Sequence, residues 1–174
     1  MNNVYLTGIM GCGKSTIGKE LAWRLGREFI DVDEYIEQSQ EKSIPRIFEE
    51  EGESGFRRIE TACLRRIVAE ASGAIVATGG GIVTVEENVR LMKESGRIVF
   101  LKRPLAEIKH SLKSAAGRPV LQGKLDSLDG VYEKRLPLYE GSADVILENK
   151  GPFSQAIEQI LAAFGEALSH SPGL

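Results

Sequence analysis

The segment from Gly8 to Ser15 has the residue types and spacing of a phosphate-binding loop. It reads Gly8-Ile9-Met10-Gly11-Cys12-Gly13-Lys14-Ser15 and matches the pattern G-x-x-x-x-G-K-[ST]. Glycines let successive backbone N–H groups turn toward phosphate oxygens, and a helix beginning near Lys14 adds the positive end of its dipole. Lys14 is expected to reach the β- and γ-phosphates, and the Ser15 hydroxyl to ligate Mg²⁺. The predicted nucleotide-binding residues are Gly11, Cys12, Gly13, Lys14, Ser15 and Thr16.

Two carboxylates, Asp31 and Asp33, follow the second apolar run and flank Val32. Ligands gather at the carboxyl ends of parallel strands, which places this pair near the phosphate loop. One carboxylate is suited to hold Mg²⁺ through water, and the other to accept a hydrogen bond or a proton from an attacking hydroxyl. Alternatively, Asp33 is the N-cap of a helix that begins at Glu34. The neighbouring phosphate loop favours the functional interpretation.

Glycines and arginines farther along the chain are candidates for a second substrate site. Gly79-Gly80-Gly81 follows the third apolar run and allows close approach of a ligand to backbone N–H groups. Arg57 precedes Glu60 by three residues, a helical spacing in which a carboxylate can hold a guanidinium in place. Arg118 and Arg135 are two further candidates. A chain of net charge −3 needs such cations in one cleft to bind a triphosphate and an anionic acceptor.

The elements that must position these residues alternate between apolar runs and amphipathic segments. Apolar runs without alternation suit strands buried on both faces of a parallel sheet. The helices are predicted from helical spacing of apolar residues. Gly26 marks the end of the helix that closes at Leu25, and Thr84 with Glu87 forms a capping box at the start of another. The predicted strands are Val4–Thr7, Phe29–Asp31, Ala74–Thr78, Arg97–Leu101 and Val145–Leu147, and the predicted helices are Lys14–Leu25, Phe56–Ala71 and Thr84 to about Ser95, with Pro104 and Pro152 as first residues of two more. This order indicates an α/β fold with a parallel sheet and right-handed crossovers.

Length, charge and cysteine content narrow the class of protein. The 174 residues predict a single domain spanning 1–174, with a long irregular segment at about 111–129 that is expected to be functional and a frayed tail from 169 to 174. The small negative charge gives no general attraction to nucleic acid or to anionic membranes. Cys12 and Cys63 form no disulfide framework and suit a reducing compartment. With neither a signal peptide nor an apolar run of roughly 20 residues, the protein is expected to be cytoplasmic.

Taken in order, these motifs resemble the shikimate kinase family over essentially the whole chain. The resemblance rests on the phosphate loop, Asp31-x-Asp33, Phe56-Arg57-Arg58-Ile59-Glu60, Gly79-Gly80-Gly81, Arg118-Pro119-Val120-Leu121, and Arg135 with Tyr139. It implies a three-layer α/β/α P-loop kinase with five parallel strands in the order 2-3-1-4-5 and a lid at about 111–125. It also implies that ATP and Mg²⁺ are used to phosphorylate the 3-hydroxyl of shikimate in the route to chorismate, by a monomer without nucleic-acid or membrane partners.

The resemblance also implies roles for individual residues. Asp33 would meet the shikimate hydroxyls as the base, while Arg57 and Arg135 would hold the carboxylate. The turn formed by Gly79, Gly80 and Gly81 would help to seat the ring. Asp31 would lie beside Mg²⁺ at Ser15. Arg118, from the lid, would bind ATP and neutralise charge on the transferred phosphoryl group. Lys14, Asp33 and Arg118 are the predicted catalytic residues.

Three positions depart from the family pattern. The lid helix lacks the arginine that stacks on adenine in many members, which leaves His110 or Lys113 as its replacement. Cys12 replaces the usual Ser or Ala, and Val120 replaces a frequent Leu. The alternatives are another small-metabolite kinase such as gluconate kinase, a nucleoside monophosphate kinase, a regulatory NTPase and an inactive binding protein. The aspartate pair and the triple glycine favour a polyol-type acceptor.

Overall fold

Five short strands form one parallel sheet in the order β2-β3-β1-β4-β5. A computed structural model describes residues 2–115 and 127–168 of the chain. The strands are β1 (Asn3–Thr7), β2 (Phe29–Asp31), β3 (Ile75–Ala77), β4 (Gly96–Lys102) and β5 (Val145–Glu148). Every neighbouring pair is parallel. The predicted fold class and strand order are confirmed.

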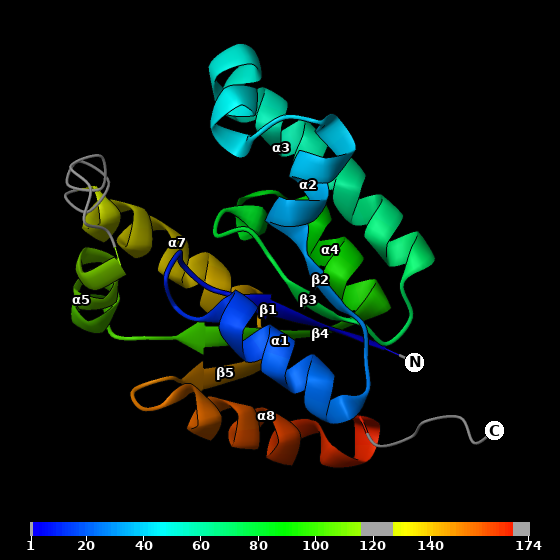
Figure 1. Ribbon diagram of the computed structural model, residues 1–174, viewed down its shortest axis with the longest axis vertical. Helices are drawn as coiled ribbons and strands as arrows, with labels where there is room; N and C mark the ends of the chain where they lie inside the picture. The colour runs from blue at the N-terminus through cyan, green and yellow to red at the C-terminus, as the bar shows by residue number, and fades with distance from the viewer. Residues whose placement is uncertain (1, 116–126, 169–174) are drawn as a thin grey trace.

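Helices cover both faces of this sheet and give three layers (Figure 1). The helices are α1 (Lys14–Leu25), α2 (Val32–Gln40), α3 (Ile44–Glu70), the 3₁₀ turn η1 (Ile82–Thr84), α4 (Glu86–Ser95), α5 (Leu105–Ala115), α7 (Leu128–Ser142) and α8 (Phe153–Leu168). Helix α1 packs against α8, whereas α4 packs against α3 and β4. Within the described ranges, no helix has both the length and the apolar character needed to cross a bilayer.

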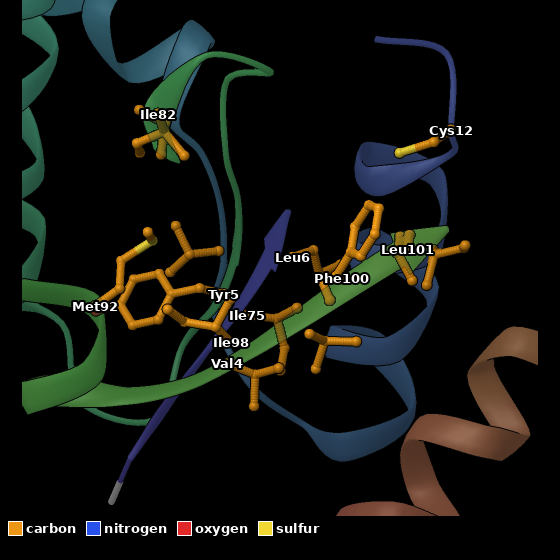
Figure 2. Packing of buried hydrophobic residues seen from close by; sticks show 14 of the residues in the cluster. Val4, Tyr5, Leu6, Cys12, Ile75, Ile82, Met92, Ile98, Phe100 and Leu101 are labelled. Atoms are coloured by element: carbon orange, nitrogen blue, oxygen red, sulfur yellow. The ribbon is translucent and has the colours of Figure 1, made fainter. Parts of the chain in front are cut away.

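The core lies on both sides of the central strands. All five residues of β1 and all three of β3 are buried. In Figure 2, Tyr5 points to one side of the sheet and Leu6 to the other. Apolar residues on both faces of a strand are the reason why these runs show no polar alternation in the sequence. This packing holds the carboxyl ends of β1, β2 and β3 at one edge, where the loops that carry the candidate residues begin.

The predicted helix over 56–71 begins earlier than expected. Helix α3 starts at Ile44 and is interrupted at Gly52, which has φ 69° and ψ −177°. A β-carbon at Gly52 would meet no atom within 4 Å, so the backbone conformation alone explains the need for glycine. The segment before Gly52 adds one wall of the acceptor cleft described below.

Other helix boundaries also differ from prediction. The prediction of a Thr84–Glu87 capping box is wrong. Helix α4 begins at Glu86, and the Thr84 hydroxyl donates to Gly81 O at 2.7 Å. Helices α5 and α8 begin one residue after Pro104 and Pro152 respectively. The predicted irregular segment at 111–129 is helical in its described parts, because α5 continues to Ala115 and α7 begins at Leu128. Residues 116–126 and the predicted tail 169–174 lie outside the described residues.

Candidate active site

The phosphate loop joins the end of β1 to the start of α1. Gly8, Gly11 and Gly13 have φ values of 140°, 77° and 101°, which side chains rarely allow. Gly13 also needs to lack a side chain for space, since a β-carbon there would come within 2.7 Å of the Phe153 ring. Helix α1 begins at Lys14, directly after Gly13. The loop and the helix N-terminus therefore have the arrangement that binds phosphate groups.

Lys14 lies inside this loop. Its Nζ donates hydrogen bonds to Gly8 O at 2.8 Å and to Ile9 O at 3.0 Å. Among the described residues, no carboxylate forms an ion pair with Lys14. The ammonium is therefore held by neutral carbonyls, and its charge is available to an anion bound at the start of α1.

Two other members of the predicted nucleotide site differ in exposure. Thr16 is exposed on the first turn of α1. The Cys12 side chain is buried in the core, with Sγ 3.8 Å from Lys14 Nζ. Cys12 can therefore reach a nucleotide only through its backbone.

Ser15 and Asp31 meet where the phosphate loop approaches the end of β2. The Ser15 hydroxyl donates to Asp31 Oδ2 at 2.6 Å. Asp31 Oδ1 accepts from the backbone N–H of Asp33 at 3.0 Å and of Glu34 at 3.4 Å, so Asp31 is the N-cap of α2. The alternative that Asp33 caps a helix starting at Glu34 is wrong, because the helix begins at Val32. The Ser15 hydroxyl and the Asp31 carboxylate are hard oxygen donors beside a phosphate site. This suits Mg²⁺, which is usually bound by one or two protein ligands together with phosphate oxygens and water.

Asp33 lies in the first turn of α2 and faces the acceptor cleft. Burial raises the pKa of its carboxyl above the ordinary value, and the negative charge of Asp31 raises it further. The positive charges of Lys14 and Arg57 lower the pKa of Asp33 and oppose this shift. A carboxylate with a raised pKa beside a phosphate site is suited to accept a proton from a hydroxyl.

Arg57 and Glu60 form a buried ion pair on α3. Arg57 Nη1 lies 2.7 Å from Glu60 Oε2, and the Glu60 side chain is completely buried. Burial raises the pKa of Glu60, and Arg57 acts against that shift. The pair confirms the predicted i, i+3 contact. A second carboxylate, Glu53, lies 3.7 Å from Arg57 Nη2.

The turn Gly79-Gly80-Gly81 is glycine-rich because charged side chains crowd it. A β-carbon at Gly79 would lie 2.9 Å from Glu60 Oε1 and 3.0 Å from Asp33 Oδ1. At Gly81, a β-carbon would lie only 2.0 Å from Arg57 Nη2. The glycines therefore allow the carboxylates and the guanidinium to gather around one backbone turn.

Helix α7 supplies the remaining cation. Arg135 Nη1 lies 3.7 Å from the position of a β-carbon on Gly80. The hydroxyl of Tyr139, one turn later, donates a hydrogen bond to Gly80 O. Arg135 therefore lies beside Gly80, as Arg57 lies beside Gly81.

A cleft of about 390 Å³ brings these groups together. Its lining combines polar and apolar side chains, which suits a ring with hydroxyl and carboxylate substituents. The polar lining includes Asp33, Arg57, Glu60, Gly79, Gly80, Gly81 and Arg135, and the apolar lining includes Ile44, Phe48, Phe56, Leu128 and Val131. Phe48 and Phe56 stack with ring centroids 4.4 Å apart. The site role of Ile44 and Phe48 was not predicted, since the glutamate-rich stretch after them shows no apolar period.

Some predicted site residues stay untested by the geometry. Arg118 and the proposed lid core lie outside the described residues. His110 is exposed on α5, and the side chain of Lys113 is outside the described part of the chain. The choice between His110 and Lys113 as the adenine contact stays a prediction.

Comparison with known proteins decides the family. A family model described as "Shikimate kinase" matches residues 10–165, which is most of the chain. The chain belongs to the shikimate kinase family. A shikimate kinase of Persephonella marina is 40% identical over 163 residues, covering 92% of this chain and 98% of the relative. The chain is thus an ATP-dependent kinase that acts on an alcohol group, as the family resemblance implies.

Solved structures support the same family assignment. A shikimate kinase from Acinetobacter baumannii in complex with shikimate is 36% identical and has a TM-score of 0.86, with coverage of 96% of this chain and 94% of that one. A gluconokinase from Sinorhizobium meliloti is only 14% identical, with a TM-score of 0.61 and coverage of 96% and 93%. That second likeness shows a shared fold and nothing about the acceptor.

Proposed function

We propose that this shikimate kinase family member transfers the γ-phosphoryl group of ATP to the 3-hydroxyl of shikimate, giving shikimate 3-phosphate and ADP on the route to chorismate and the aromatic amino acids. The observation that supports this most is the single cleft lined by Asp33, Arg57 and Arg135. Because Ile9 and Met10 of the phosphate loop line the same cleft, the acceptor would lie next to the nucleotide.

The acceptor would be held by charge on one side and by apolar contact on the other. Arg57, beside Gly81, and Arg135, beside Gly80, would bind its carboxylate. The stacked rings of Phe48 and Phe56 would face the apolar surface of its ring. Asp33 would contact the ring hydroxyls and take the proton from the attacking 3-hydroxyl, for which its raised pKa is favourable.

The nucleotide would be bound by Gly11, Cys12, Gly13, Lys14 and neighbouring residues of the loop. Thr16 and the lid residue Arg118 would add further contacts, Arg118 acting on the transferred phosphoryl. Ser15 and Asp31 would hold Mg²⁺, since their oxygens already lie together. Bound Mg²⁺ supplies positive charge to the phosphate oxygens. Lys14 would stabilise the charge that develops on the phosphoryl group during transfer.

The proposed setting is a cytoplasmic monomer, a single kinase domain over residues 1–174 that uses small-molecule substrates without nucleic-acid or membrane partners. A net charge of −3 supports this view, since it gives no general attraction to polyanions. Both cysteines are free and buried, which suits a reducing compartment.

An ADP-release assay with three acceptors tests the proposal. Purified protein is given ATP and Mg²⁺ with shikimate, gluconate or a nucleoside monophosphate. Turnover with shikimate is expected to exceed turnover with the other two by at least about 10³-fold, because only shikimate would satisfy both the arginines and the apolar wall. Preference for gluconate or a nucleoside monophosphate would overturn the proposed acceptor and leave the kinase family assignment intact.

A further inference from the structure

Tyr139 is a buried polar residue to which the proposed chemistry assigns no role. It is one of the largest fully buried side chains, and its ring stacks on Phe100 with centroids 5.0 Å apart. Its hydroxyl donates a hydrogen bond to Gly80 O. This bond spans 59 residues of sequence and connects α7 to the glycine turn of the acceptor cleft.

The hydrogen bond restrains more than a carbonyl group. The Gly80 carbonyl and the Gly81 N–H belong to one planar peptide unit, and the described residues contain no cis peptide bond. In a trans peptide these two groups point in opposite directions, so fixing one also fixes the other. Glycine peptides otherwise rotate more freely than any other, which makes an external restraint effective here.

The N–H group thus oriented is free to act on a ligand. Neither Gly80 nor Gly81 donates a backbone hydrogen bond to any residue in the described ranges. Both residues line the acceptor cleft, between Arg57 and Arg135. An N–H in that position can reach an anionic oxygen that the two guanidinium groups also attract.

We infer that Tyr139 is a positioning residue, whose hydroxyl holds the Gly80–Gly81 peptide so that the Gly81 N–H stays directed at an oxygen of the acceptor. The inference rests on the proposed function. Burial also raises the pKa of the Tyr139 hydroxyl above its ordinary value, so the group stays protonated and able to donate at neutral pH. Tyr139 and Arg135 lie one turn apart on α7, and the same helix therefore positions two acceptor contacts.

A matched pair of substitutions separates positioning from stability. Tyr139→Phe keeps the ring on Phe100 and removes only the hydroxyl. Tyr5→Phe is the control, because Tyr5 is equally buried and its hydroxyl lies 2.6 Å from Ser95 Oγ, away from the cleft. Both variants are expected to lose similar amounts of thermal stability, because each hydroxyl has two polar partners. The Tyr139 hydroxyl contacts Gly80 O and the Arg135 side chain, and the Tyr5 hydroxyl contacts Asn3 Nδ2 and Ser95 Oγ.

The substrate constants are expected to differ between the two variants. Tyr139→Phe should raise the KM for shikimate about five- to tenfold, the effect of one hydrogen bond, while the KM for ATP changes less than about twofold. Tyr5→Phe should change neither constant. An unchanged shikimate KM in Tyr139→Phe, with reduced stability, would overturn the inference. If the wild-type protein itself does not turn over shikimate, the proposed function and the inference are overturned together.

A second measurement uses the wild-type chain and does not depend on the folding of a variant. In protein labelled with ¹⁵N-glycine, saturating shikimate is expected to shift the Gly81 amide proton downfield and to slow its exchange with solvent. A Gly81 amide that is unaffected by bound shikimate would also overturn the inference, because the oriented N–H would then have no partner.

Discussion

The guanidinium of Arg57 occupies the space beside Gly81 that any other residue would need for its side chain. A β-carbon on Gly81 would lie 2.0 Å from Arg57 Nη2, well inside van der Waals contact. Gly81 has φ −101°, which alanine adopts readily. The requirement for glycine at this position therefore comes from the arginine and not from the backbone.

Gly81→Ala is expected to displace Arg57 and to raise the KM for shikimate by at least about tenfold, since a charge-assisted bond is worth about 1.5–3 kcal/mol. Gly130→Ala is the control, because Gly130 lies in α7 and its β-carbon would meet nothing within 4 Å. That change should stabilise the fold by about 0.5–1 kcal/mol without altering KM. Equal effects of the two variants on KM would contradict the role of Arg57.

Replacing Lys14 by methionine is expected to lower kcat by at least about 10²-fold, the usual effect of losing one charge-stabilising donor. Methionine keeps the length of the side chain but cannot donate to Gly8 O and Ile9 O or stabilise a phosphoryl group. Steady-state kinetics would measure the loss, and circular dichroism would show that the fold is retained. A folded Lys14→Met variant with near-normal kcat would refute the assignment of the phosphate loop.

Arg57→Ala is expected to weaken the binding of shikimate more than the binding of ATP, because the proposed partner of Arg57 is the carboxylate of the acceptor. A rise of about 10- to 100-fold in the KM for shikimate should accompany a rise of less than about threefold for ATP.

Added salt should also raise the wild-type KM for shikimate, since screening weakens charge recognition in a cleft open to solvent. Equal losses for both substrates, or a flat salt response, would argue against carboxylate recognition.

The raised pKa of Asp33 predicts the acid side of the pH profile. The proposed base works as a carboxylate, so kcat/KM should fall as the pH drops through a pKa above the ordinary aspartate range of about 3.5–4. Arg57 lowers the pKa of Asp33, and Arg57→Gln should therefore move this limb to higher pH. Rates measured between about pH 4 and pH 8 test the shift. If Asp33→Asn retained the same limb, the titration would belong to another group.

The sequence predicted the parts of the site that depend on local pattern. The phosphate loop, Asp31, Asp33 and the glycine turn each follow an apolar run, and their positions come from the rule that ligands bind at the carboxyl ends of parallel strands. The sequence could not show that Arg57 and Arg135 converge, because one lies on α3 and the other on α7. Their approach to the same glycine turn depends on tertiary packing.

The missed features have the same kind of cause. Phe48 belongs to the cleft only because α3 changes direction at Gly52, and a run of glutamates there hides any apolar period. The sequence predicts Glu60 as the partner of Arg57, but only the fold reveals that its side chain is fully buried. The Thr84 error arose because its hydroxyl bonds backward to Gly81 O and does not cap the following helix.

Asp31 serves both halves of the site at once, since one carboxylate oxygen accepts from Ser15 and the other holds the first turn of the helix that carries Asp33. The side chains expected to replace Asp31 with least damage are those that can both cap a helix and meet the proposed Mg²⁺, namely asparagine, serine and threonine. A substitution that weakens the proposed Mg²⁺ binding would at the same time change the orientation of Asp33, the proposed base. A change at Asp31 is therefore expected to affect ATP and the acceptor together.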